Sequence, residues 1–370
     1  MRATRIIISG GGTGGHIFPA IAIANALRRA EPGCEILFVG ATGRMEMEKV
    51  PAAGYKIVGL NIAGIQRGSI VKNLALPFKL MGSVQKALKL ISDFKPDVVV
   101  GVGGYASGPV LFAASWKNVP YLIQEQNSYA GVTNKRLGRN ASKICVAFDG
   151  MDAFFPAENI LKTGNPVRKD VVDIENKHFH GSELLKLDPL KKTILVTGGS
   201  LGAGTLNKSI EKHLQDFVEQ DVQLVWQTGK YYYTGIMERI GPNFHPNVRI
   251  LEFLNQMDLA YAAADVIISR AGAGTIAELC LIKKPVILVP SPNVAEDHQT
   301  KNALALVKNN AAMLINDRSA EDTMVKEALD LLKDEERCEL LAENIGKMAL
   351  PDADELIAAE IFKLAGKGGI

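Results

Sequence analysis

The chain has 370 residues, more than one hydrophobic core usually serves, and this length predicts two domains. Hydrophobic residues make up 47% of it and charged residues 22%, which is typical of a folded, water-soluble protein and excludes a disordered chain. No apolar run is long enough to span a bilayer, and no signal peptide precedes the first predicted strand. We therefore expect a cytoplasmic protein without a membrane-spanning helix.

The net charge of +2 is unevenly distributed along the chain. Residues 1–165 carry 19 Lys and Arg against 10 Asp and Glu, a balance of +9, whereas the remainder has a balance of −7. This excess of positive charge favours an anionic partner for the first half, such as a phosphate, a nucleic acid or an anionic membrane. The alternative is an accidental difference between two surfaces.

The cysteines and histidines indicate no metal site. The four cysteines are far apart and form neither a C-x-x-C pair nor a Cys/His metal-binding spacing: Cys34, Cys145, Cys280 and Cys338. The six histidines include no H-E-x-x-H pattern. We therefore expect buried thiols in a reducing compartment, and no metal ion.

The first predicted strand, residues 5–10, runs into a cluster in which five of the six residues 10–15 are glycine. Because glycine allows a ligand or another backbone to approach closely, this cluster indicates a binding loop. His16 follows at the start of a predicted helix, where the helix dipole disfavours the imidazolium ion and keeps the ring neutral, as a general base requires. The alternative is a structural histidine that hydrogen-bonds within the fold.

The same cluster fits the G-x-G-x-x-G pattern of dinucleotide-binding enzymes. That pattern also needs an acidic residue at the end of the second strand, to hold the ribose of the cofactor. The second predicted strand, residues 35–40, ends in Val39 and Gly40, and Glu35 lies at its wrong end. We therefore expect no nicotinamide or flavin cofactor.

Apolar strand-like runs alternate with helical segments through both halves of the chain. They lie at 5–10, 35–40, 97–104, 119–125, 143–148, 192–197, 222–229, 248–253, 265–272 and 285–290. This alternation predicts an α/β protein with parallel sheets covered on both faces, as two Rossmann-like domains. Glycine-rich turns occur at 10–15, 101–108, 198–204 and 271–274. Because ligands bind at the carboxyl ends of such strands, two domains facing a central cleft would gather these turns around a phosphate-bearing ligand.

Residues 70–91 combine lysines, including Lys72 and Lys79, with large apolar side chains. Helical spacing assigns four of the apolar residues to the core: Leu80, Val84, Leu88 and Ile91. Phe78 is left as an exposed apolar tip. For the stretch as a whole, packing in the core is the preferred interpretation, and an exposed tip at Phe78 is the alternative.

Three polar segments follow predicted strands. Residues 124–139 contain an acid and amides and end in a basic run, Lys135, Arg136 and Arg139. Residues 270–280 place Glu278 about one turn into a helix, where it could accept both ribose hydroxyls of a nucleotide; the alternative is a packing turn with a surface glutamate. Residues 293–303 are polar, and the sequence leaves open whether they bind a sugar or form a solvated loop.

The order of these segments predicts the domain boundaries. A linker is predicted at 154–171, which contains two prolines and a Gly-Asn turn. Residues 352–366 are predicted to form an amphipathic helix that packs on the first domain. We therefore expect one domain from 1–165 with 347–370, and a second from 166–346.

Six motifs occur in this chain in the order in which the MurG family of glycosyltransferases has them: "GGTGGH", "GVGGYASGP", "QEQN", "TGNPVR", "GGSLGA" and "RAGAGTIAE". The resemblance covers essentially the whole sequence. It implies the two-domain fold of glycosyltransferase B type, with the C-terminal helix returning to the N-terminal domain.

The resemblance also implies the reaction and its partners. The family moves N-acetylglucosamine (GlcNAc) from UDP-GlcNAc to the 4-hydroxyl of N-acetylmuramic acid (MurNAc) in undecaprenyl-diphosphoryl-MurNAc-pentapeptide, with inversion at the anomeric carbon and without a metal or other cofactor. This converts lipid I to lipid II in peptidoglycan synthesis. The implied location is peripheral, on the cytoplasmic face of the anionic inner membrane. Cell-wall and division proteins are further expected partners, and nucleic acid is not.

Matching motif to motif carries roles over to this sequence. His16 becomes the candidate base and Glu278 the ribose ligand. The residues implied to bind UDP-GlcNAc also include Thr13, Gly14, Gly15, Asn127, Arg168, Ser200, Leu254, Ala271, Gly272, Ala273, Gly274, Thr275, Ile276 and Gln299. The residues expected on the acceptor or membrane side are Tyr105, Lys72, Phe78, Lys79, Lys135, Arg136 and Arg139.

The chain departs from the family pattern at two places. Thr300 stands where many relatives have a second glutamine, and Ala271 where a serine is common.

The residues alone leave two other functions open. A UDP-GlcNAc 2-epimerase would share the architecture but need acidic and histidine groups around C2 of one sugar, and a nucleotide-sugar sensor on the membrane would not need His16.

Overall fold

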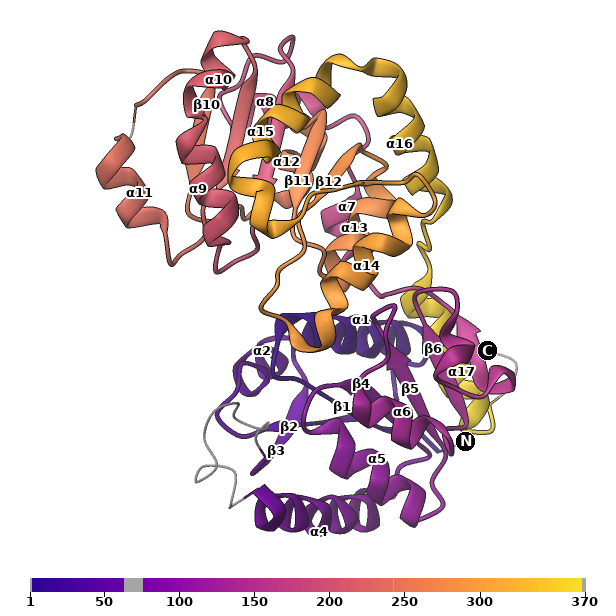
Figure 1. The fold of residues 1–370 in the computed structure, drawn as a ribbon. Helices are drawn as coiled ribbons and strands as arrows, with labels where there is room; N and C mark the ends of the chain where they lie inside the picture. The colour runs from indigo at the N-terminus through magenta and orange to yellow at the C-terminus, as the bar shows by residue number, and fades with distance from the viewer. Residues whose placement is uncertain (1, 63–75, 242, 368–370) are drawn as a thin grey trace. The chain divides into compact units, whose positions relative to one another are not determined.

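The computed structural model describes residues 2–62, 76–241 and 243–367. The chain divides into two compact units, residues 1–167 with 350–370, and residues 168–349. Each unit is a parallel β-sheet with helices on both faces (Figure 1). The predicted α/β class with two Rossmann-like domains is confirmed.

The first unit contains a seven-stranded sheet in the order β3-β2-β1-β4-β5-β6-β7. Its strands are β1 (Arg5–Gly10), β2 (Glu35–Ala41), β3 (Lys56–Leu60), β4 (Val98–Gly103), β5 (Tyr121–Glu125), β6 (Lys143–Val146) and β7 (Ile160–Lys162). Its helices include α1 (Gly14–Ala30), α2 (Glu46–Ala52), α4 (Leu76–Phe94), α5 (Ser107–Trp116), α6 (Val132–Gly138) and α17 (Ala353–Leu364).

The central strands of this sheet are apolar along their whole length because both faces are covered. Ile6 and Ile8 belong to the core on the side of α1 and α17, whereas Ile7 belongs to the core on the side of α4 and α5. All three side chains are fully buried. The uninterrupted β-branched run of β1 is thus the signature of a central parallel strand.

The C-terminal helix α17 packs on α1 within the first unit, as predicted. Ile357, Ile361 and Phe362 join the same core as α1. At the surface, Arg29 donates to the Asp354 carboxylate at 2.7 Å. The last segment of the chain therefore completes the N-terminal domain.

The second unit contains a six-stranded sheet in the order β10-β9-β8-β11-β12-β13. Its strands are β8 (Thr193–Thr197), β9 (Gln223–Gln227), β10 (Val248–Leu251), β11 (Val266–Ser269), β12 (Val286–Leu288) and β13 (Met313–Leu314). Its helices include α7 (Lys169–Val172), α8 (His178–Leu184), α9 (Gly204–Lys212), α10 (Leu214–Glu219), α11 (Tyr233–Ile240), α12 (Met257–Ala263), α13 (Ala273–Ile282), α14 (His298–Val307), α15 (Asp317–Lys333) and α16 (Glu335–Lys347).

Both sheets reverse their strand order at the centre, between β1 and β4 in the first unit and between β8 and β11 in the second. Ligands of doubly wound sheets bind at this switch point, beyond the carboxyl ends of the strands. The four glycine-rich turns follow these four strands. They therefore pair two by two, one pair at the switch point of each unit.

Helix α4 corrects one prediction. Its buried residues are Ser83, Ala87 and Ile91, one helical turn apart, so small side chains face the sheet. Leu80 is 49% exposed and is not part of the core, whereas Val84 and Leu88 are partly buried. The helix is rotated from the predicted orientation because Ser83 and Ala87 allow it to pack closely.

Candidate active site

The two glycine turns of the first unit contact each other directly. Gly104 has φ +86°, and a Cβ there would lie 2.2 Å from the carbonyl oxygen of Gly11. The hydroxyl of Ser107, at the start of α5, donates to the carbonyl of Ser9 at 2.7 Å and accepts from the N–H of Gly103 at 3.2 Å. The glycines thus allow two backbones to pack against each other, which is one of the two uses that the sequence indicated.

His16 lies in the first turn of α1, as predicted. Its Nδ1 is 3.2 Å from Oγ1 of Thr13, the N-cap residue of the helix. The ring edge bearing Cδ2 and Nε2 lies over Gly103, because a Cβ at Gly103 would be 2.6 and 2.8 Å from these two atoms. Thr13 and Gly103 therefore hold the imidazole from two sides, and only glycine leaves room for it.

Glu46 also contacts the glycine loop and was not singled out from the sequence. Its carboxylate accepts the N–H of Gly12 at 2.9 Å and the N–H of Ala41 at 2.9 Å. The residue is 1% exposed. Glu46 lies six positions beyond the predicted strand 35–40, and nothing in the sequence links it to Gly12.

A second buried carboxylate, Glu125, organises the loop that contains Asn127. It accepts the N–H of Asn127 at 3.1 Å, the N–H of Gly131 at 3.2 Å and the side-chain amide of Asn134 at 2.8 Å. Burial raises the pKa of Glu125, and these bonds oppose the shift. Asn127 is thus fixed at the end of β5.

The predicted acceptor-side residues of the first unit are largely on the surface. Tyr105 is 52% exposed, directly after Gly104. Arg136 and Arg139 are exposed at α6, whereas the ammonium of Lys135 lies 3.7 Å from the ring centre of Tyr129. Lys72 lies outside the described residues.

Helices α4 and α5 pack side by side (Figure 1). Both helices expose large apolar side chains. We call these residues the apolar patch: Phe78, Leu80, Met81, Phe112 and Trp116. Phe78 is 74% exposed, as predicted, and Trp116 is 70% exposed. Phe112 and Trp116 were missed because apolar residues of a helix between two strands are ordinarily core.

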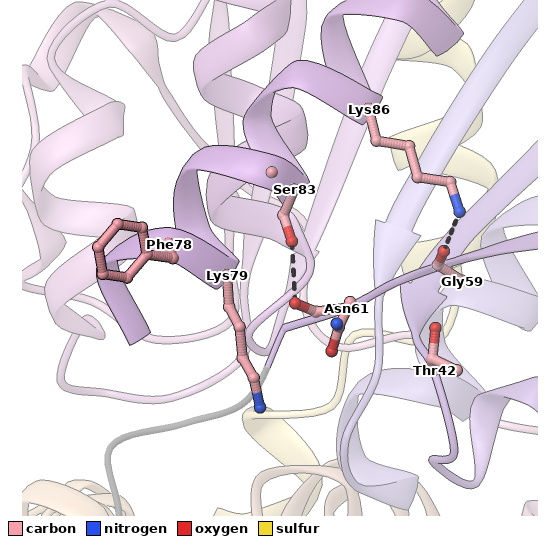
Figure 2. Close-up of a pocket in the computed structure, with 8 residues that line it drawn as sticks. Thr42, Gly59, Asn61, Phe78, Lys79, Ser83 and Lys86 are labelled. Carbon is pink, nitrogen blue, oxygen red and sulfur yellow. Dashed lines mark hydrogen bonds between the residues drawn. The ribbon is translucent and has the colours of Figure 1, made fainter. Parts of the chain in front are cut away.

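A pocket of about 470 Å³ lies beside α4, lined by Thr42, Gly59, Asn61, Phe78, Lys79, Gly82, Ser83 and Lys86. Figure 2 shows Lys86 reaching back to the carbonyl of Gly59, at 2.7 Å, while the Phe78 ring extends away from that bond. Ser83 donates to the carbonyl of Asn61 at 3.2 Å. The pocket thus separates the exposed aromatic tip from the ends of β2 and β3.

In the second unit, Gln227 joins two loops at the carboxyl ends of the strands. Its amide nitrogen donates to the carbonyl of Gly199 at 3.0 Å, and its amide oxygen accepts the N–H of Leu254 at 3.0 Å. This bond occupies the Leu254 N–H. Ser200, beside Gly199, is exposed. Gln227 was not singled out from the sequence.

Glu278 lies partly buried in α13 and accepts a hydrogen bond from the hydroxyl of Tyr261 at 3.1 Å. Burial raises the pKa of Glu278 to about 7, against the lowering effects of Tyr261 and of the Arg168 guanidinium. Arg168 and Glu278, 110 positions apart by their numbering, are thus close enough to interact electrostatically. Both were predicted site residues.

The turn 271–276 forms the N-terminus of α13. Gly272 is the N-cap residue, and its carbonyl accepts the N–H of Ile276 at 2.9 Å. A Cβ at Gly274 would meet no atom within 4 Å, so this face of the helix end is open. Ala271 and Ile276 are buried. The N–H groups of Gly274 and Thr275, in the first turn of the helix, are the groups that a helix N-terminus offers to an anion.

The loop before α14 is conformationally strained. Glu296 and Asp297 have φ +56° and +52°, a region that costs a non-glycine residue about 1–2 kcal/mol. Gln299 accepts the N–H of Ser291 at 2.8 Å, and Thr300 donates to Asp297 at 2.7 Å. Such strain concentrates at binding sites, because the surrounding structure must hold it.

Two features are absent from the part of the chain that the structure describes. Residues 2–62, 76–241 and 243–367 contain no group of three or more His, Cys, Asp or Glu side chains that could hold a metal ion. Within the same ranges, the helices are too short or too polar to cross a bilayer.

Comparison with known proteins assigns both units. Residues 6–146 match the N-terminal domain of glycosyltransferase family 28, and residues 193–357 match its C-terminal domain. A Parabacteroides distasonis protein is 55% identical over 367 residues, which cover 99% of this chain and 100% of that protein. It is named UDP-N-acetylglucosamine--N-acetylmuramyl-(pentapeptide) pyrophosphoryl-undecaprenol N-acetylglucosamine transferase. A protein of the same name from Flavobacterium psychrophilum is 50% identical over 364 residues, 98% of each chain.

Solved structures agree with this assignment. The crystal structure of Acinetobacter baumannii MurG aligns with a TM-score of 0.78 and 28% identity, over 97% of this chain and 99% of that one. A putative UDP-N-acetylglucosamine 2-epimerase from Listeria monocytogenes aligns with a TM-score of 0.69 over 97% of this chain and 96% of that one, but at 17% identity it shares the fold alone. The chain is a glycosyltransferase that belongs to glycosyltransferase family 28 and, within it, to the MurG family.

Proposed function

We propose that this enzyme transfers GlcNAc from UDP-GlcNAc to the 4-hydroxyl of MurNAc in undecaprenyl-diphosphoryl-MurNAc-pentapeptide, which converts lipid I to lipid II. The observation that carries the proposal is a match of 50–55% identity over nearly the whole chain to transferases named for these substrates. The 2-epimerase alternative has less support, because its likeness is confined to the fold at 17% identity.

The donor is assigned to the second unit. Glu278 accepts the two ribose hydroxyls, the carbonyl of Leu254 accepts from the uracil ring, and Gln299 contacts the sugar. The first turn of α13 and the loop at Ser200 meet the diphosphate. Backbone N–H groups and the dipole of this ten-residue helix stabilise the negative charge that develops on the departing UDP.

The acceptor and the base are assigned to the first unit. A proton on Nδ1 of His16, donated to Thr13, leaves the Nε2 lone pair to take the proton of the 4-hydroxyl. The hydroxyl oxygen then bonds to C1 of GlcNAc from the face opposite UDP, and the bond between C1 and the phosphate oxygen breaks with its electron pair going to UDP. Attack from the opposite face inverts the anomeric carbon.

The first unit is also assigned to the membrane surface. The apolar patch combines five large exposed side chains on two neighbouring helices, and exposed lysines, Lys79, Lys86 and Lys89, lie on α4. Near an anionic leaflet each such charge contributes about 1 kcal/mol of attraction. We therefore place the enzyme at the cytoplasmic face of the membrane, where its lipid-linked acceptor would be met.

UDP release distinguishes the three functions. We expect the purified enzyme to release UDP from UDP-GlcNAc only when a lipid I analogue is present, and to form a disaccharide product. A 2-epimerase would convert UDP-GlcNAc to its C2 epimer without an acceptor. Binding of UDP-GlcNAc with neither release nor epimerisation would indicate a sensor and refute the proposal.

A further inference from the structure

Glu46, the first residue of α2, is a buried carboxylate to which the proposed reaction gives no role. Its two carboxylate oxygens are divided between two segments of backbone. One accepts from Gly12 in the loop after β1, and the other from Ala41 at the end of β2, both at 2.9 Å. The side chain therefore joins the glycine loop to the neighbouring strand.

The surrounding backbone is shaped to admit this carboxylate. A Cβ at Gly11 would lie 2.3 Å from Cδ of Glu46, and a Cβ at Gly40 would lie 2.5 Å from its Cγ. Both distances are too short for real atoms, so a side chain at either position would displace Glu46. Gly12 needs to be glycine for a different reason, its φ of +88°. Part of the glycine cluster thus accommodates a protein carboxylate.

Burial of a carboxylate is unfavourable unless its oxygens accept hydrogen bonds. A hydrogen bond from an N–H group to a carboxylate is about twice as strong as one between neutral groups. Because the Gly12 N–H donates to Glu46, it is not available to a ligand. The N–H groups of Gly14 and Gly15, in the first turn of α1, have no acceptor within the helix. An anionic substrate would therefore meet the helix end rather than Gly12.

We propose that Glu46 is a positioning residue for the transfer reaction, which acts by fixing the loop from which His16 projects. The inference rests on the proposed function. Gly12 directly precedes Thr13, and Thr13 in turn bonds His16, so the carboxylate, the loop and the imidazole form one chain of contacts.

The test is the pair of variants E46Q and E46D. A glutamine can accept only one of the two N–H groups, and an aspartate is one methylene too short to reach both. We expect the exchange of the Gly12 amide proton, followed by NMR, to become at least tenfold faster. Misplacement of a catalytic group by about 1 Å can cost about 100-fold, so kcat should fall about 10- to 100-fold. The KM for UDP-GlcNAc, which binds in the other unit, should stay within about twofold.

The matched control is E48Q on the same helix, because Glu48 is exposed. It should match wild type in every readout. A kcat within threefold of wild type in E46Q or E46D, with faster Gly12 exchange, would show that Glu46 is structural only. Unprotected Gly12 in wild type would also overturn the proposal, and this measurement needs no variant. If wild type does not transfer GlcNAc, the proposed function fails, and Gly12 exchange still decides whether Glu46 holds the loop.

Discussion

Tyr261 donates a hydrogen bond to Oε2 of Glu278 at 3.1 Å. Burial disfavours both the phenolate of Tyr261 and the carboxylate of Glu278. Burial raises the pKa of Tyr261, so the phenol remains a neutral donor. Burial also raises the pKa of Glu278 from its ordinary value of 4.5 to about 7. The proposed ribose ligand therefore changes its charge within the physiological pH range.

This shift predicts a pH dependence of donor binding. Two ribose hydroxyls donate best to an ionised carboxylate, and below pH 7 the free enzyme must first lose the Glu278 proton. The Kd for UDP, measured by calorimetry, should therefore rise as pH falls below about 7, by at most about tenfold per pH unit. E278Q should bind UDP more weakly at pH 8 and show a flat profile between pH 6 and 8. A sloping E278Q profile would assign the proton to another group.

The same shift predicts that Glu278 destabilises the fold. Its folded pKa lies above its unfolded value, so the folded state binds the proton more tightly, and stability falls as pH rises from 4.5 to about 7. The penalty is on the order of 1–3 kcal/mol above pH 7. E278Q should therefore have a higher Tm than wild type at pH 8 and the same Tm at pH 4.5. A lower Tm at pH 8 would contradict this.

Gln227 should couple two loops of the donor site. Q227A leaves the buried Leu254 N–H without its acceptor, and an unsatisfied buried group costs about 1–3 kcal/mol. The bond to the carbonyl of Gly199, which is exposed, is lost as well. Part of this cost should appear in binding, as about a 5- to 50-fold higher Kd for UDP.

Gln223 on the same strand is the matched control. It is equally buried, but it bonds the backbone of Asp188 at the opposite end of β9. Q223A should lower the Tm by a similar amount and leave the Kd for UDP unchanged. Equal Kd values for the two variants would show that Gln227 contributes only to stability.

Gly104 should not tolerate a side chain. G104A places a Cβ 2.2 Å from the Gly11 carbonyl at φ +86°, so both the clash and the strain oppose it. The control is G54A, which has a φ of +82° but no atom within 4 Å of the added Cβ. Strain alone costs about 1–2 kcal/mol. Urea unfolding should therefore show a larger loss for G104A, and its turnover should fall as the two glycine turns separate.

The apolar patch should bind lipid. F78S combined with W116S removes two large exposed side chains, so sedimentation with phosphatidylglycerol vesicles should decrease while the Tm is unchanged. Charge reversal at Lys72, Lys79 and Arg139 should act in the same direction, and mainly at low salt. L190S is the control, because Leu190 is 88% exposed in the other unit. Equal sedimentation of the double variant and wild type would locate the membrane surface elsewhere.

The fold was predictable because its signals are local. A buried parallel strand such as Ile6–Ile8 is apolar without alternation, and the turn that follows it is rich in glycine. The position of His16 at a helix N-terminus followed from the same pattern. Its partner Gly103 did not, because the contact depends on β1 and β4 being neighbours in the sheet.

Residues that act through distant partners were not predictable. Glu46 bonds Gly12 across 34 positions, and Gln227 bonds Leu254 across 27. No pattern in a single sequence encodes such a pairing. The exposure of Leu80 and Trp116 was missed for a related reason: which face of a helix meets the sheet is decided by how closely small residues such as Ala87 allow it to approach.

His16 gives the most direct test of the chemistry. A sugar hydroxyl is a weak nucleophile, and a positioned base contributes about 10²- to 10⁴-fold. H16A should lower kcat by about this factor, while the Kd for UDP-GlcNAc, assigned to the other unit, stays nearly constant.

The control for H16A is H180A, the same change at an exposed histidine of α8, which should leave kcat, Kd and Tm unchanged. T13V removes the hydroxyl beside Nδ1 and keeps the ring, so it separates orientation from proton transfer. We expect about a fivefold lower kcat, because one neutral hydrogen bond contributes about 1 kcal/mol. A structural histidine would give another pattern, a lower Tm with kcat intact in the folded fraction. A kcat of H16A within threefold of wild type would place the base on another residue.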